Sequence, residues 1–131
     1  MTYYGGNNMM RGELDKAIFE KYIAPTQKSR DSSIGIEIEL PVVNLSGEAV
    51  DEGLVIGIAD DFREHFSFDI VGKDDDGNIN STSDPQSGDN LSFDCSYSNL
   101  ELSLGKGDDL NEIHSRFKKY YSYLQQQLLL Q

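Results

Sequence analysis

The chain has 131 residues, and its length, composition and charge exclude several classes of protein. We expect one domain over residues 1–131, because a chain of this length cannot build two sizeable cores, and 37% apolar with 26% charged residues exclude a disordered or fibrous protein. The net charge of −12 repels phosphate backbones and anionic lipids, and no apolar run is long enough to span a bilayer, so we expect neither nucleic acid nor a membrane as a partner. A single cysteine, Cys95, and the lack of an export signal favour a cytoplasmic location.

The N-terminal region is expected to be a flexible start followed by one helix. Residues 1–10 are rich in glycine and asparagine, so we expect them to be flexible. Leu14, Ile18 and Tyr22 then recur at helical spacing, and Pro25 marks the expected end of this helix.

The middle of the chain combines a strand, a helix and a polar loop. Residues 34–43 alternate with the period of two that is typical of a strand. Residues 51–66 return to helical spacing behind Asp51, a candidate N-cap. A short strand over 67–71 and a turn follow, and the polar stretch 80–90 is expected to be an exposed loop.

The C-terminal part is expected to hold two more strands and a long helix. Residues 91–97 and 99–105 have the pattern of strands, and in the second one leucines alternate with polar residues. Residues 108–130 form an amphipathic helix in which Asp109 and Glu112 make a capping box. The complete pattern predicts an α+β fold, in which helices pack on one face of an antiparallel sheet and the other face is open and acidic.

Four carboxylates in the predicted strands are candidate metal ligands. Glu37 and Glu39 lie two positions apart, about 7 Å in a strand, and so point to the same face, opposite the isoleucines. Glu101 has the same relation to a row of leucines. Asp94 precedes Glu101 by seven positions, so only a bulge or turn between them would bring both to one face. Converging carboxylates suit Mg²⁺ or Mn²⁺, which take hard oxygen ligands.

The same alternation has a simpler explanation that involves no chemistry. In a half-exposed sheet, polar residues opposite an apolar row are the solvated face. Two glutamates in one strand are common, so the alternation on its own favours this explanation. The alternative of a metal site requires the two glutamate-bearing strands to lie near each other in one sheet.

Cys95 follows a candidate ligand directly but is not expected to be a nucleophile. No base that would activate a thiol is identifiable from the sequence, since both histidines fall on predicted helices. We expect Cys95 to be a small buried or half-buried side chain.

The segments "IGIEIELPVV" and "LSFDCSYSNLELSLG" together resemble the N-terminal part of the glutamate–cysteine ligase family. Members of that family carry a G-x-E-x-E strand, which is matched here by Gly35, Glu37 and Glu39. A later strand of the family carries a glutamate near a small residue, which is matched by residues 101–103. Asp94 occupies the place of an acidic residue that some members have.

The resemblance covers roughly residues 33–127 and implies an ATP-dependent ligase that joins glutamate to cysteine, the first step of glutathione synthesis. It implies a curved sheet that resembles that of glutamine synthetase. On this sheet, the carboxylates would hold Mg²⁺ or Mn²⁺ against the phosphates of ATP. The implied metal ligands are Glu37, Glu39, Asp94 and Glu101, and the implied small-molecule substrates are glutamate, cysteine and ATP.

The chain departs from that family in its length, so activity of the chain alone is not expected. The ligases are much longer, and this sequence has no glycine-rich phosphate loop and only scattered basic residues. We therefore expect a fragment or a split subunit that needs a C-terminal partner. The alternative is a non-catalytic module derived from the same fold, which self-associates or binds another protein. The apolar end of the last predicted helix favours a homo-oligomer.

Overall fold

The structure is a computed structural model that describes residues 7–28 and 33–130, and it divides the chain into two compact units. Unit 1 is Met1–Ser32 and unit 2 is Ser33–Gln131. The single domain that the sequence predicts over residues 1–131 stays a prediction. The expected flexible segment falls partly outside the described residues, since the description begins at Asn7, where the backbone is already helical.

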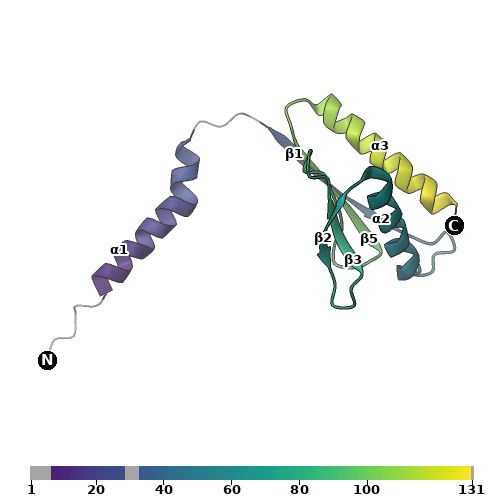
Figure 1. The fold of residues 1–131 in the computed structure, drawn as a ribbon, viewed down its shortest axis with the longest axis horizontal. Helices are drawn as coiled ribbons and strands as arrows, with labels where there is room; N and C mark the ends of the chain where they lie inside the picture. The colour runs from purple at the N-terminus through teal and green to yellow at the C-terminus, as the bar shows by residue number, and fades with distance from the viewer. Residues whose placement is uncertain (1–6, 29–32, 131) are drawn as a thin grey trace. The chain divides into compact units, whose positions relative to one another are not determined.

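Unit 1 is a helical segment with three kinds of turn. It consists of α1 (Asn7–Ile18), a π-helical turn η1 (Phe19–Ile23) and a 3₁₀ turn η2 (Ala24–Gln27) (Figure 1). The helical segment continues two residues past the predicted end at Pro25, which lies in the first turn of η2. None of the residues 11–28 is buried.

Unit 2 holds a five-stranded antiparallel sheet and two helices, which confirms the predicted α+β class. The strands are β1 (Ile34–Pro41), β2 (Asp69–Lys73), β3 (Ile79–Ser83), β4 (Asn90–Phe93) and β5 (Asn99–Gly107). They follow the order β1-β5-β4-β3-β2, so β1 and β2 form the edges. The helices are α2 (Glu52–Phe66) and α3 (Leu110–Leu129).

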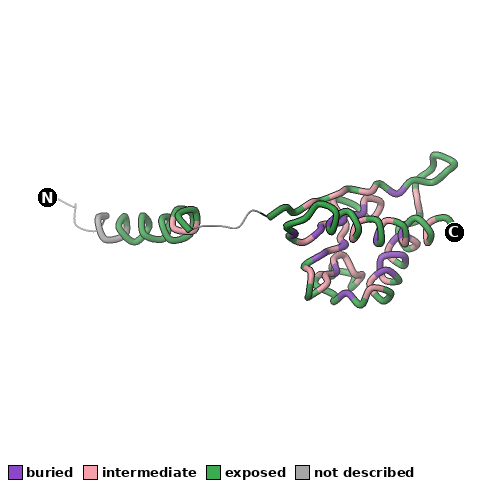
Figure 2. Tube along the Cα trace, turned by 90° about the horizontal axis from the view of Figure 1, so that it is seen from above, coloured by how far each residue is buried: buried purple, intermediate pink, exposed green. Residues whose placement is uncertain are grey.

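The core lies between one face of this sheet and the two helices. Leu100, Leu102 and Leu104 alternate along β5 and are buried, together with Phe62 of α2 and Leu124 of α3. Figure 2 shows the buried positions on these helices and strands. Within the described residues, no helix is both long and apolar enough to cross a membrane.

The ends of α2 follow directly from its sequence. The Asp51 carboxylate accepts a hydrogen bond from the Leu54 N–H, as predicted for an N-cap. Ser67 ends the helix in the left-handed conformation, with φ of 58°, and its N–H donates to the carbonyls of Arg63 and Glu64. This reversal turns the chain from α2 into β2.

The polar stretch 80–90 is not the exposed loop that the sequence predicts. It forms most of β3, a tight turn and the start of β4, and within it Thr82 and Asp89 are fully buried. Their neighbours in these strands are serines and asparagines rather than apolar residues, so the apolar alternation that marks a strand is missing.

Candidate metal centre

The pairing of β1 with β5 brings the two glutamate-bearing strands side by side. Glu39 lies directly opposite Glu101, and Glu37 lies opposite Ser103. All four side chains point to the sheet face that carries no helix of unit 2, because the leucines between them fill the core. We call this face the open face; Ser92 and Ser81 continue the row beyond Glu101. The acidic character expected for the whole face stays a prediction.

A tight turn after β4 brings Asp94 to the same face. The Asp94 N–H donates to the Asn99 carbonyl, and the Ser96 N–H donates back to the Asp94 carbonyl. Cys95 between them has a φ of 61°, a left-handed conformation that is uncommon for a residue other than glycine. Because this turn separates β4 from β5, the seven-residue spacing no longer places Asp94 and Glu101 on opposite faces of one strand. Both side chains can therefore contribute to one site.

The three carboxylates of Glu39, Asp94 and Glu101 form a compact group, which we call the acidic triad. One oxygen of each lies within 4.8 Å of one oxygen of each of the others. Glu37 is not a member of this group, so its role as a ligand stays a prediction.

Each carboxylate of the acidic triad accepts a hydrogen bond from a neutral side chain. The donors are the Asn99 amide to Glu39 at 3.4 Å, the Cys95 thiol to Asp94 at 3.2 Å and the Ser103 hydroxyl to Glu101 at 3.1 Å. These donors orient the carboxylates but bring no positive charge. No lysine or arginine in the described ranges forms an ion pair with the triad.

The arrangement therefore concentrates negative charge without a protein cation to offset it. Like charges at directly opposite positions of a sheet destabilise the pairing of the strands. A divalent cation would remove this cost, and carboxylates at such separations are the hard oxygen donors that Mg²⁺ and Mn²⁺ prefer. The donor set fits either cation.

Cys95 is exposed, so the expected burial of its side chain is wrong. Its hydrogen bond to Asp94 and the charge of that carboxylate raise the pKa of the Cys95 thiol, and Glu39 adds to the effect. The thiol therefore stays protonated as a donor to Asp94. The prediction that Cys95 is no nucleophile stays a prediction.

A second hydrogen bond fixes the turn that carries Asp94. The Tyr97 hydroxyl donates to the Asp74 carboxylate in the turn between β2 and β3, so two hairpin turns are joined at one end of the sheet. This bond, together with the Asn78 side chain, lowers the pKa of Asp74. The connection limits the movement of Asp94 relative to the sheet.

An apolar groove of about 700 Å³ lies beside the acidic triad. It is lined by the end of β1, the following segment and the C-terminal half of α3, and Glu39 is its one acidic residue. Leu45 is 100% exposed at the groove and Leu129 is 81% exposed.

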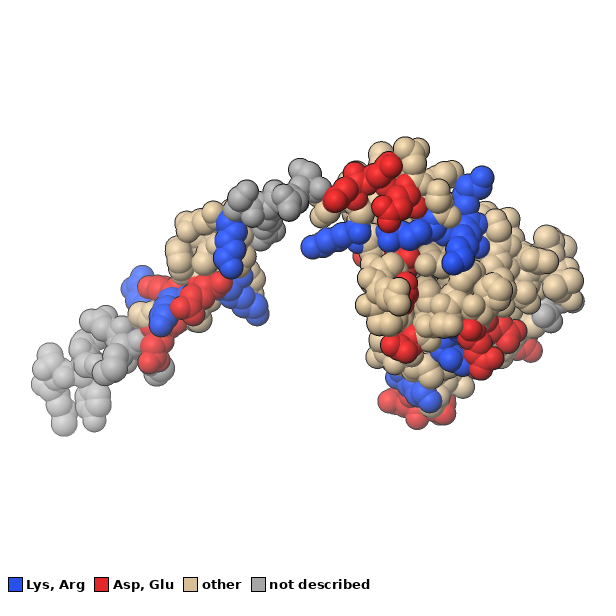
Figure 3. Space-filling model, turned by 45° about the horizontal axis from the view of Figure 1, so that its top comes forward, with Lys and Arg blue, Asp and Glu red and all other residues tan. Residues whose placement is uncertain are grey.

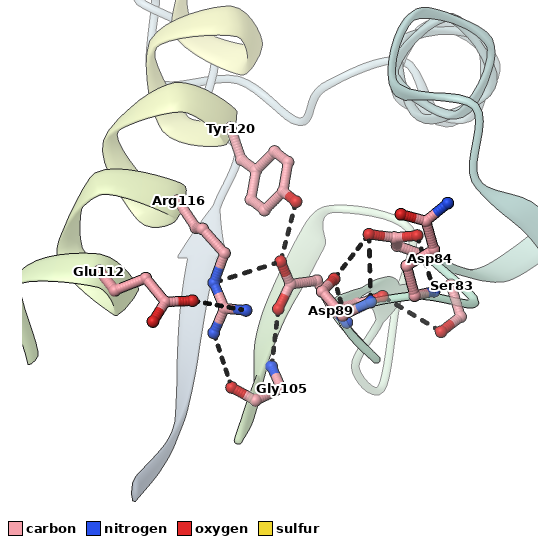
Figure 4. Close-up of polar contacts among 9 residues, drawn as sticks. Ser83, Asp84, Asp89, Gly105, Glu112, Arg116 and Tyr120 are labelled. Carbon is pink, nitrogen blue, oxygen red and sulfur yellow. Dashed lines mark hydrogen bonds and ion pairs between the residues drawn. The ribbon is translucent and has the colours of Figure 1, made fainter. Parts of the chain in front are cut away.

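A second carboxylate site, which the sequence does not reveal, surrounds the fully buried Asp89 (Figure 4). One oxygen accepts from the Gly105 N–H at 2.7 Å, and the other accepts from the Tyr120 hydroxyl at 2.8 Å. The Arg116 guanidinium lies 3.6 Å from the same oxygen and donates to the Gly105 carbonyl at 2.8 Å. We call these four residues the Asp89 cluster.

The electrostatics of this cluster follow from its burial. Burial and the bond to Asp89 raise the pKa of Tyr120. In the adjoining turn, the Ser87 hydroxyl and nearby backbone N–H groups lower the pKa of Asp84. The Asp89 cluster joins β5, α3 and the β3–β4 turn, which indicates a structural role.

Comparison with known proteins adds no support to any one function. No family model, curated protein or solved structure matches the chain. The resemblance to glutamate–cysteine ligases accordingly stays a prediction, and function is inferred from the geometry of the carboxylates.

Proposed function

We propose that this chain binds one divalent cation, Mg²⁺ or Mn²⁺, through Glu39, Asp94 and Glu101. The observation that carries this proposal is the meeting of three carboxylate oxygens within 4.8 Å, with no basic partner among the described residues. The three carboxylates come from β1, from β5 and from a turn that contains a left-handed residue. Polar residues that only solvate a sheet face do not need such a turn to bring them together.

The resemblance to glutamate–cysteine ligases suggests a use for this cation. In such a ligase the metal neutralises charge on the phosphates of ATP while the glutamate carboxylate is activated and cysteine attacks. We propose the acidic triad as the metal-binding part of a ligase-like site in the cytoplasm, with glutamate, cysteine and ATP as substrates. Basic groups that grip the phosphates would come from a further polypeptide segment or subunit.

Titration of the purified chain with Mn²⁺, followed by the electron paramagnetic resonance signal of the free ion, tests the cation site. We expect one site with a Kd on the order of 0.1–1 mM, because few protein ligands contribute and the group is open to solvent. Glu101→Gln should weaken binding at least tenfold. Glu37→Gln is the matched control, since it removes the same charge from the open face outside the triad, and it should retain binding.

Two results would reject the proposal of a cation site. One is the absence of saturable binding by the wild type at millimolar Mn²⁺, and the other is an equal loss in both variants. Repeating the titration with a non-hydrolysable ATP analogue, with the Mn²⁺ that the analogue binds without protein subtracted, tests nucleotide binding separately: additional binding that the wild type shows and Glu101→Gln lacks supports a nucleotide site on this chain, and its absence contradicts one on this chain alone.

A non-catalytic docking module is the second candidate function. The apolar groove favours it, because exposed leucines such as Leu45 and Leu129 surround a concave surface. In this case Glu101→Gln would leave partner binding unchanged, whereas Leu45→Lys would reduce it.

A further inference from the structure

The helical segment of unit 1 exposes a continuous apolar stripe that none of the residues described in this unit covers. Leu14, Ile18 and Tyr22 lie four residues apart and share one side of the helix, with exposed fractions of 60%, 43% and 62%. Phe19 and Ile23, both partly exposed, widen this side. We call these five residues the apolar stripe.

The π-helical turn keeps the apolar stripe aligned. The Ala24 N–H donates to the Phe19 carbonyl, which closes the wider turn of a π-helix. With more than four residues per turn, side chains four apart stay nearly above one another, so Phe19 and Ile23 fall on the same side. The helical segment is short, and a helix of 12–15 residues is only marginally stable in water without packing on its apolar side.

The charges of the chain favour a second copy as the partner of this stripe. Residues 33–131 carry six basic and 19 acidic side chains, a net charge of −13, whereas residues 1–32 carry five basic and four acidic ones. Contact between two copies through unit 2 would bring strongly acidic surfaces together. Contact through the helical segment avoids this repulsion, because acidic and basic side chains are interleaved along it (Figure 3).

The order of these charges also selects an orientation. Residues 11–15 carry Arg11, Glu13 and Asp15 and have a net charge of −1, whereas residues 16–21 carry Lys16, Glu20 and Lys21 and have a net charge of +1. Two antiparallel copies centred near Ile18 place Asp15 of each beside Lys21 of the other, and Lys16 of each beside Glu20 of the other. Their helix dipoles are opposed as well, which is the favourable arrangement.

We infer that the apolar stripe is a self-association surface, on which the same segment of a second copy packs in antiparallel orientation around a two-fold axis near Ile18. Such a contact is isologous and closes at the dimer. The interface is small, so the dimer is transient and forms with rising protein concentration.

Sedimentation velocity of the full chain in EDTA, over about 10–500 µM for a weak interface, tests this inference independently of the cation site. We expect the wild type to shift from monomer to dimer. Ile18→Lys should weaken the dimer at least tenfold, whereas Leu45→Lys, the same apolar-to-lysine change at an exposed leucine of unit 2, should not. A wild-type monomer throughout, or loss of the dimer in Leu45→Lys, would overturn the inference.

Disulfide cross-linking tests the orientation in a Cys95→Ser background. Ile18→Cys lies near the two-fold axis and should form a covalent dimer under mild oxidation. Leu14→Cys should not, because two antiparallel copies of residue 14 are about 12 Å apart along the helix axis, beyond the reach of a disulfide. Equal cross-linking of both variants would indicate parallel packing, and cross-linking of neither would contradict the stripe contact.

Discussion

Unit 2 contains two carboxylate sites that differ in how their charge is offset. Asp89 is fully buried, and both of its oxygens accept hydrogen bonds while Arg116 lies nearby. The acidic triad lies on the open face, where Asn99, Cys95 and Ser103 supply only neutral donors. Removing a buried carboxylate that has partners is costly to the fold, whereas the triad carboxylates have no cationic partner among the described residues and are the proposed cation site.

The comparison predicts opposite consequences when a charge is removed from each site. Loss of a carboxylate from the Asp89 cluster should lower the free energy of unfolding, because buried partners lose their acceptor. Loss of one from the acidic triad should not, unless a cation is bound.

The largest effect is expected for Asp89→Ala. This change leaves the Tyr120 hydroxyl and the Gly105 N–H without their acceptor and removes the negative charge beside the Arg116 guanidinium, and we expect a loss of about 3–5 kcal/mol in the free energy of unfolding. Urea denaturation followed by circular dichroism measures it. Asp75→Ala, at an exposed turn position, is the control and should change stability by less than about 0.5 kcal/mol. Equal effects in the two variants would show that the cluster is not structural.

Gly105→Ala tests how closely the β3–β4 turn packs on β5. A methyl group at this position would overlap the carbonyl of Ser87, so the turn must move, and we expect a loss of about 2–3 kcal/mol. Gly57→Ala is the control, since a methyl group there meets no neighbour within 4 Å on an exposed face of α2, and it should stabilise the chain slightly. Thermal unfolding compares the two, and a stable Gly105→Ala variant would contradict the observed contact.

Tyr120→Phe removes one hydrogen bond from the Asp89 cluster, and we expect a loss of about 1.5–2 kcal/mol at pH 7. Because the pKa of Tyr120 is raised in the folded state, its contribution is complete below the unfolded pKa of about 10 and is lost as the pH rises above that value. Urea titrations at pH 8 and pH 11 should therefore show a smaller difference between wild type and variant at the higher pH. A difference that grows with pH would be inconsistent with the bond.

The sequence predicts the elements whose side chains alternate in polarity and misses those that are polar throughout. The leucines of β5 and the Asp51 cap of α2 are local signals, and both elements form as expected. β3 lacks such a signal because its only buried residue is Thr82 and its other residues are mostly serine and asparagine.

The two carboxylate sites also differ in how much of each can be predicted from local sequence patterns. Glu39 and Glu101 follow from strand parity, but the position of Asp94 depends on a turn that only the backbone around Cys95 defines. The partners of Asp89 lie 16 and 31 residues away in the chain, at Gly105 and Tyr120, and no local pattern connects them.

The most direct test of the cation site compares the free energy of unfolding of wild type and Glu101→Gln with and without Mn²⁺. In EDTA the variant should be at least as stable as the wild type, because one of three like charges is removed. At a Mn²⁺ concentration of about ten times Kd, the wild type should gain about 1.4 kcal/mol and become the more stable of the two. The same order of stability in both conditions would contradict a cation site in the acidic triad.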